Sequence, residues 1–159
     1  MSSRLSDALR DKLELPGVGG GRVMVDGEAG TVEVDLSAKG PIGAKVHRVR
    51  VESRNPGPLE QQATGICERV RGLGERLVPV EVDDRLGGGV LRSDPGDMRG
   101  KRYFEVGLDG EGATLERWKA KPQGGREREA FEVTREQLGR LVDDLAEGLN
   151  SHGAPSTSP

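Results

Sequence analysis

The sequence predicts an α+β fold in which three helices accompany an antiparallel sheet of about seven or eight strands. Runs of alternating apolar and polar residues precede each of two amphipathic helical segments, and a shorter helical segment comes first. Turns rich in Gly, Asp and Pro separate these runs, as is typical of antiparallel strands. The expected order is therefore a helix, three strands, a helix, four or five strands and a last helix.

The first helix is predicted from leucines at helical spacing, with either Ser3 or Ser6 as its N-cap. In the third of the strands that follow, Val46 is out of phase with Val49 and Val51, which predicts a bulge. The alternation of apolar residues places these three strands at residues 22–26, 31–36 and 45–52.

An apolar stripe predicts the second helix, from Pro58 to Leu77. Small residues such as Ala63 and Gly65 lie beside this stripe. They would allow close contact with a second copy of the chain, which makes this helix a candidate homodimer contact. The alternative is that the helix packs on its own sheet, and the sequence leaves both open.

The second half begins with an edge strand, because Pro79 interrupts the alternation of Val78 and Val80 and cannot donate to a central ladder. Thr134 and Gln137 have the spacing of a capping box at the start of the last helix. Further strands are predicted at residues 90–91, 102–108, 113–121 and 130–133.

Composition limits the class of protein. The chain has 159 residues, 33% apolar and 32% charged, which fits one domain over 1–149 and a disordered tail over 150–159. The net charge of −3 gives no general attraction to nucleic acid or to anionic membrane. A single Cys excludes an internal disulfide, and no apolar run approaches the roughly 20 residues of a membrane span. The N-terminal residues lack a signal-peptide pattern, so we expect a cytoplasmic protein without membrane contact.

Motifs for catalysis and for cofactor binding are not found. The glycine clusters at 17–21 and 85–89 lack the Lys-Ser or Lys-Thr pair of a phosphate loop. His47 and His152 have no Cys or His at metal-ligand spacing, and Cys67 on the apolar stripe is expected to be a buried, inert thiol. We therefore expect no catalytic residue, metal or cofactor. An enzyme with an unrecognised carboxylate site is the alternative.

Basic and aromatic residues gather near the single Trp of the chain. Alternation directs Phe104 and Leu115 into the core and leaves Glu105 toward solvent. Strands that expose Arg, Lys and aromatic side chains are typical of single-strand nucleic-acid binders, although facing glutamates would neutralise much of the charge. An exposed Trp beside an exposed Tyr also anchors protein interfaces. The candidate binding residues are Tyr103, Arg117, Trp118, Lys119, Arg48 and Arg50, with Tyr103 and Trp118 expected to be exposed opposite each other. The alternative is that a bulge turns Trp118 inward.

The order of elements is similar, at the level of layout, to that of secretion-chaperone α+β domains. That resemblance implies a small acidic dimer that binds protein segments. The layout is also similar to the doubled four-strand-plus-helix unit of PUR-type binders, which implies single-stranded nucleic acid as the ligand. We therefore expect a non-enzymatic, chaperone-like protein-binding domain that self-associates. A single-stranded nucleic-acid-binding module that uses the hairpin around Trp118 is the alternative.

Overall fold

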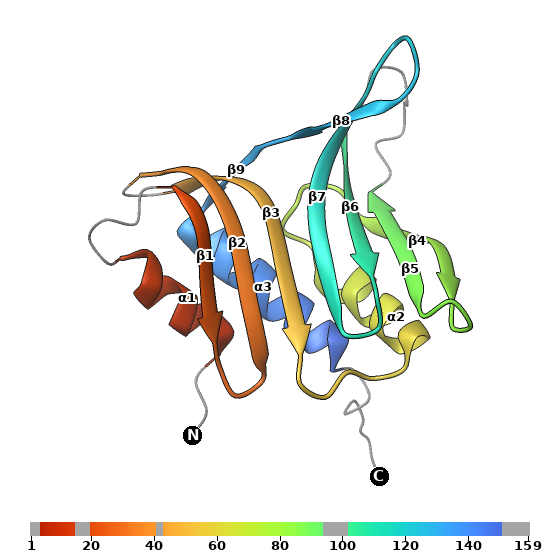
Figure 1. Cartoon of the computed structure of the whole chain (residues 1–159), viewed down its shortest axis with the longest axis horizontal. Helices are drawn as coiled ribbons and strands as arrows, with labels where there is room; N and C mark the ends of the chain where they lie inside the picture. The colour runs from red at the N-terminus through yellow and green to blue at the C-terminus, as the bar shows by residue number, and fades with distance from the viewer. Residues whose placement is uncertain (1–3, 15–19, 41–42, 94–101, 151–159) are drawn as a thin grey trace.

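Three helices and a nine-stranded antiparallel sheet make up the described part of the chain, residues 4–14, 20–40, 43–93 and 102–150 of a computed structural model (Figure 1). The helices are α1 (Leu5–Leu13), α2 (Leu59–Arg69) and α3 (Arg135–Leu149). The strands are β1 (Gly21–Asp26), β2 (Gly30–Lys39), β3 (Gly43–Ser53), β4 (Leu77–Asp83), β5 (Gly88–Ser93), β6 (Arg102–Leu108), β7 (Gly112–Ala120), β8 (Arg126–Glu129) and β9 (Phe131–Thr134). The predicted α+β class and the order of helices and strand groups are confirmed, but the described sheet has nine strands instead of seven or eight, with six instead of four or five in the second half.

Two meanders meet in the middle of the sheet. The strand order is β1-β2-β3-β7-β6-β5-β4, so the first meander ends at β3 and the second runs backwards from β7 to β4. β1 and β4 are the edges of this path, which confirms the prediction that Pro79 lies in an edge strand. Hydrogen bonds between β3 and β7 join the two meanders into one sheet.

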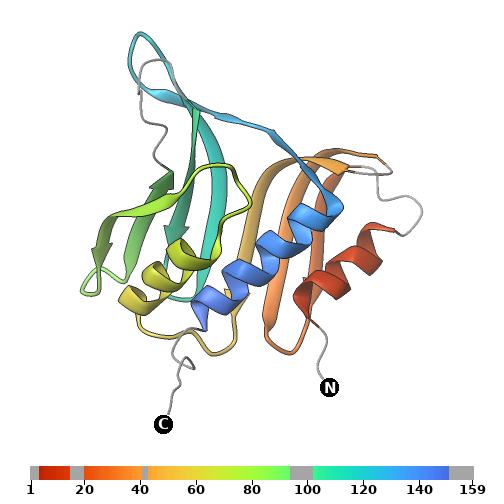
Figure 2. The same cartoon turned by 180° about the vertical axis from the view of Figure 1, so that it is seen from behind.

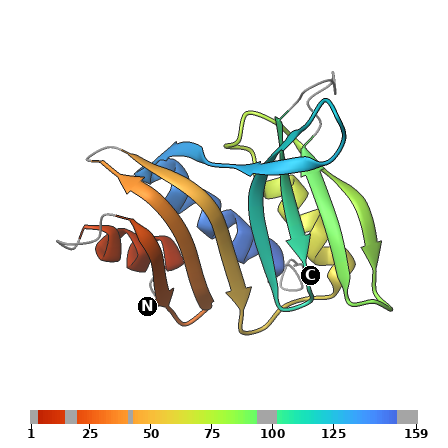
Figure 3. The same cartoon turned by 45° about the horizontal axis from the view of Figure 1, so that its top comes forward.

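β3 has two partners on one side. It pairs with β7 over Val49–Glu52 and with β9 over Gly43–Val46. β7 continues past β3 and pairs instead with β8, which leads directly into β9. Figure 3 shows β8 and β9 as a continuous strap from the second meander back to the first. At this end of the sheet, β9, which comes late in the chain, thus takes the place beside β3 that β7 leaves.

The helices lie together on one face of the sheet (Figure 2). α1 packs on β1 and β2, and also on α3. α2 contacts β4 and β5, whereas α3 contacts β3 and β9. The helix that follows the first meander thus covers β4 and β5 of the second meander, and the helix that follows the second covers β3 of the first. The sequence did not indicate this exchange.

The core lies between the helices and this face of the sheet. Val34, Val49 and Leu115 on the sheet and Ile66 and Leu145 on the helices are completely buried. The predictions that Phe104 and Leu115 face the core are therefore confirmed. The other face of the sheet has no helix on it and carries mostly charged side chains, so that face is the open surface of the molecule.

Two local predictions are confirmed by the backbone. The register of β2 against β3 jumps from Asp35↔Arg48 to Leu36↔Val46, which is the bulge expected near Val46. Thr134 caps α3, and its side chain and that of Gln137 form the expected capping box.

Two predictions of helix ends are wrong. Arg4, not Ser6, is the N-cap of α1, and Ser6 is buried where its amide and hydroxyl donate to Asp143 of α3. Ser3, the other candidate cap, lies outside the described residues. α2 ends at Arg69 instead of continuing to Leu77, because Val70 has an extended backbone and Leu77 begins β4.

Several expectations concern parts of the chain that the structure does not describe. Most of the first glycine cluster and the tail beyond Asn150 lie outside the described ranges. Within those ranges, none of the helices has the length and apolar character needed to cross a membrane.

Candidate functional site

The predicted site residues do not form one surface. Tyr103 and Trp118 face each other across β6 and β7, as expected. Arg117 points to the helix-covered side of the sheet, where its guanidinium lies 4.5 Å from the centre of the Phe104 ring. The β6–β7 register pairs Lys119 with Arg102, one position beyond Tyr103–Trp118. Arg48 and Arg50 belong to β3, in the other meander.

The expected exposure of the two aromatic residues needs correction. Tyr103 is only 7% exposed, although it lies on the open face, and Trp118 is half-buried. No described helix covers this face of the sheet (Figure 2). The neighbouring side chains must therefore be what shields the two rings from water. The expectation of two exposed aromatic anchors is therefore wrong.

The covering side chains are arginines. The Arg126 guanidinium lies 3.9 Å from the centre of the Trp118 ring, and that of Arg128 lies 5.7 Å from it. Arg92 lies 5.0 Å from the centre of the Tyr103 ring. Such distances are those of cation–π contacts, which are worth about 0.5–2 kcal/mol each depending on desolvation. The strands β5 and β8 supply these arginines, and the register explains why: β5 places Arg92 opposite Glu105, and β8 places Arg128 opposite Trp118.

Glu105 joins the arginines into a cluster. Its carboxylate accepts hydrogen bonds from Arg126 at 2.8 Å and from Arg92 at 3.0 Å, and Arg126 also donates to the Tyr103 hydroxyl at 3.2 Å. Burial by itself would raise the pKa of Glu105, but the bonds from Arg126 and Arg92 outweigh it, so the pKa lies below its ordinary value. The hydrogen bond to Glu105, together with that to the Tyr103 hydroxyl, raises the pKa of Arg126. We call this group the arginine–aromatic cluster; its members are Arg92, Tyr103, Glu105, Trp118, Arg126 and Arg128.

The charged groups of the cluster are paired with one another or with adjacent side chains. Arg128 pairs with Glu116 at 3.3 Å, as the expected neutralisation by facing glutamates requires. Guanidinium groups also lie over the Trp118 ring, where a nucleic-acid base would have to stack. The indole Nε1 of Trp118 is enclosed and has no hydrogen-bond partner among the described residues. Arginine and aromatic rings therefore stabilise one another here.

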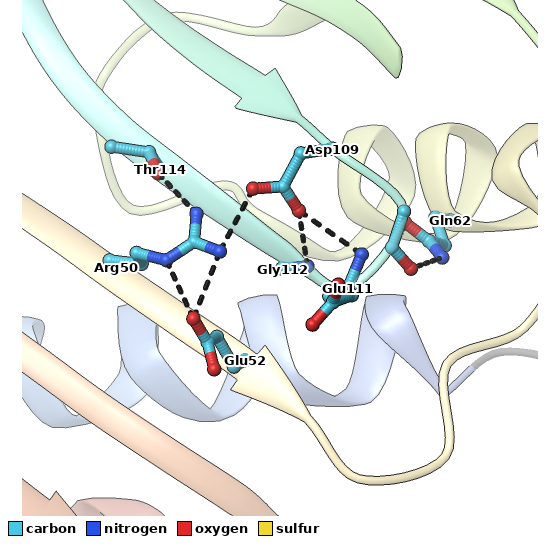
Figure 4. A network of polar contacts seen from close by, with 8 residues as sticks. Arg50, Glu52, Gln62, Asp109, Glu111, Gly112 and Thr114 are labelled. Carbon is cyan, nitrogen blue, oxygen red and sulfur yellow. Dashed lines mark hydrogen bonds and ion pairs between the residues drawn. The ribbon is translucent and has the colours of Figure 1, made fainter. Parts of the chain in front are cut away.

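Arg50 forms a second network, at the junction of the meanders (Figure 4). Its guanidinium donates to Thr114 on β7 at 2.9 Å, to Asp109 at 2.9 Å and to Glu52 on its own strand at 3.1 Å. The side chain is only 17% exposed. Burial tends to raise the pKa of Asp109, but backbone hydrogen bonds from Gly112 and Glu111, together with Arg50, lower it overall. Arg50 thus connects β3 to the β6–β7 hairpin and is not available to a ligand in this arrangement.

The remaining candidates carry little chemistry. Cys67 is a free thiol and is half-buried, not fully buried as expected, and burial raises its pKa, which disfavours the reactive thiolate. Across the described ranges, no group of three or more His, Cys, Asp or Glu residues is arranged to hold a metal ion. Arg126 and Arg128 lie in the basic stretch near Trp118 but are not among the candidate binding residues, and neither is Arg92 on β5; the strand register is the signal that brings all three to the aromatic pair.

No family model, no curated protein and no solved structure matches this chain.

Proposed function

We propose that this chain is a non-enzymatic protein-binding domain that self-associates through the β4–β5 hairpin. The observation that carries the proposal is the position of exposed apolar side chains. Among the described residues, four large apolar side chains are exposed: Met24, Val78, Val80 and Leu86. The last three belong to β4 and to the turn that follows it, at a free edge of the sheet.

A second copy of the chain is the partner that this edge suits. Two copies related by a two-fold axis would present the same apolar residues to each other, as homodimers commonly do. Pro79 and the bulge between Pro79 and Glu81 interrupt the edge, so contact would involve side chains more than a continuous backbone ladder. The stripe of α2, the earlier candidate, supports self-association less well, because Leu59, Ala63 and Ile66 are buried within the chain itself.

Light scattering tests the proposal. The unmodified chain should have twice the monomer mass at high micromolar concentration. Val80→Lys should have the monomer mass, because dimerisation would bury the lysine charge without an opposite charge to pair with it. Met24→Lys is the matched control, since Met24 is 57% exposed and Val80 53%, and it should remain dimeric. A monomeric unmodified chain would exclude self-association.

Single-stranded nucleic acid is the second candidate ligand. Arg92, Arg126 and Arg128 exceed Glu105 and Glu116 by one charge beside the Tyr103–Trp118 pair. Binding would require the guanidinium groups to leave the Trp118 ring. Titration with single-stranded DNA, followed by Trp118 fluorescence, should then show quenching that weakens steeply with salt. An unchanged emission spectrum at low salt would remove this candidate.

A further inference from the structure

A groove of about 330 Å³ lies on the helix-covered side, between α3 and the segment that follows α2. Its apolar lining comes from Val70, Leu73 and Leu141, with Val133 at one end. Val70 and Leu141 are nearly buried, whereas Leu73 is only partly covered. The groove is thus a depression with a mixed polar and apolar lining, of a size that accepts one or two side chains of a partner.

Charged residues of α3 form its rim. Glu136, Arg140 and Asp144 line the groove at intervals of four residues, so they occupy one face of the helix in the order acid, base, acid. None of the three forms an ion pair with another described residue. The arginines of the open face contrast with them, because Arg50, Arg92 and Arg126 are all paired internally.

The pKa of Asp144 lies above its ordinary value. Burial raises its pKa, and the nearby Glu147 and Asp143 raise it further, whereas Arg140 and Arg69 lower it. Asp143 accepts hydrogen bonds from Ser6 and so connects α3 to α1, whereas Asp144 accepts no hydrogen bond from α1 in the described structure. A carboxylate with a raised pKa that lines a depression is a candidate for binding a basic group.

We infer that this groove binds an amphipathic helical segment of a partner protein, whose apolar side chains enter between Leu73 and Leu141 while basic, acidic and basic residues face Glu136, Arg140 and Asp144. Complementary charge at every fourth position would set the position of the segment, and the apolar contact would supply most of the affinity. The inference rests on the proposed protein-binding function but uses a surface separate from the β4–β5 hairpin.

The test uses a synthetic helical peptide in which Lys, Glu and Lys recur at every fourth position beside two leucines. The full chain should bind it in isothermal titration. Gly72→Phe should abolish binding, because Gly72 lines the groove and a Cβ atom added there meets no other atom within 4 Å. Circular dichroism should show that this variant stays folded, since the backbone at Gly72 has room for a side chain.

Charge reversal tests whether the charged residues of α3 recognise the peptide or whether it binds through apolar contact alone. Asp144→Lys should weaken the peptide about fivefold, the equivalent of about 1 kcal/mol, and a peptide with Glu in place of the facing Lys should restore affinity. Val80→Lys should bind the original peptide as the unmodified chain does, because Val80 is not part of the groove.

The outcomes distinguish this inference from the proposed function. Absence of binding by the unmodified chain, or equal binding by Gly72→Phe, would overturn the groove while leaving a dimer in light scattering intact. Equal binding of both peptides to Asp144→Lys would overturn the charge match. If the unmodified chain is a monomer and binds the peptide, and Gly72→Phe abolishes that binding, the groove would be supported and self-association refuted.

Discussion

Trp118 illustrates at the scale of a residue how neighbours change the role of a side chain. Alternation along β7 places it on the face without helices, where it was expected to be exposed. Arg126 and Arg128 cover its ring, and Tyr103 lies opposite. The ring therefore contributes to stability, and a role in recognition would require the arginines to move.

Trp118→Ala is accordingly expected to lower the free energy of unfolding by about 2–3 kcal/mol, from lost burial of the ring and lost cation–π contacts. Urea unfolding followed by circular dichroism measures this. A loss below about 0.5 kcal/mol would show that the cluster contributes little to folding. Arg85→Ala is a suitable control, because that side chain is 93% exposed, and it should leave stability almost unchanged.

Glu105 predicts a dependence of stability on pH. Its pKa is lowered in the folded chain, so its ionised form stabilises the fold above the ordinary Glu pKa of about 4.3. That contribution disappears as the pH falls through the lowered folded-state value. Glu105→Gln should therefore be less stable than the unmodified chain at neutral pH, and the two should converge on acidification. Melting temperatures between neutral and acid pH measure the difference. A constant difference across this range would contradict the assignment.

α2 and α3 show at the scale of elements why close packing escaped prediction. Gly148 of α3 lies against α2, and a Cβ atom there would be 2.6 Å from Ile66 Cγ1 and 2.9 Å from the Ile66 backbone nitrogen. The hydrophobic stripe of α3 was clear from the sequence, but a glycine within it gave no sign that another helix passes over it.

Gly148→Ala should force the helices apart and lower the free energy of unfolding by about 1–3 kcal/mol, the usual effect of overpacking. Gly72→Ala is the matched control, because no atom lies within 4 Å of its added Cβ, and it should be close to neutral. Chemical denaturation of both variants measures this. Equal stabilities would mean that α2 and α3 adjust to the extra methyl group without strain.

Elements with a strong local signal were predictable from sequence. The capping box of Thr134 marked the start of α3, the alternation in β6 and β7 identified the core residues, and Pro79 indicated an edge. The end of α2 was not predictable, because Leu73 and Leu77 continue the helical period although the backbone leaves the helix at Val70. The arginine–aromatic cluster depends on the register between the consecutive strands β5, β6, β7 and β8, and local alternation contains no information on that register.

At the scale of the whole molecule, the exchange of helices between the meanders should make unfolding cooperative. α2 covers β4 and β5, α3 covers β3, and β9 completes the edge of β3. A local defect in one meander thus weakens the support of the other. The expected behaviour is a single transition, as in other small domains with one core.

Trp118 provides the measurement, because it reports on the second meander. Leu9→Ala in α1, which packs on the first meander, should shift the denaturation midpoint of Trp118 fluorescence and of circular dichroism equally, by about 2–4 kcal/mol in free energy. Two separate midpoints would show that the meanders unfold independently. Thr64→Ala, at an exposed position on α2, should leave both signals unchanged.

The position of α3 has a consequence for synthesis of the chain. β3 is covered by the helix made last, so its apolar residues, such as Val49, lack this cover while the ribosome is still adding the second meander, whereas α1 can already cover β1 and β2. A nascent chain in this state is exposed to aggregation until residues 135–149 leave the exit tunnel. Ribosome stalling or premature termination before α3 would thus release a product with an open hydrophobic sheet, which chaperones and proteases recognise.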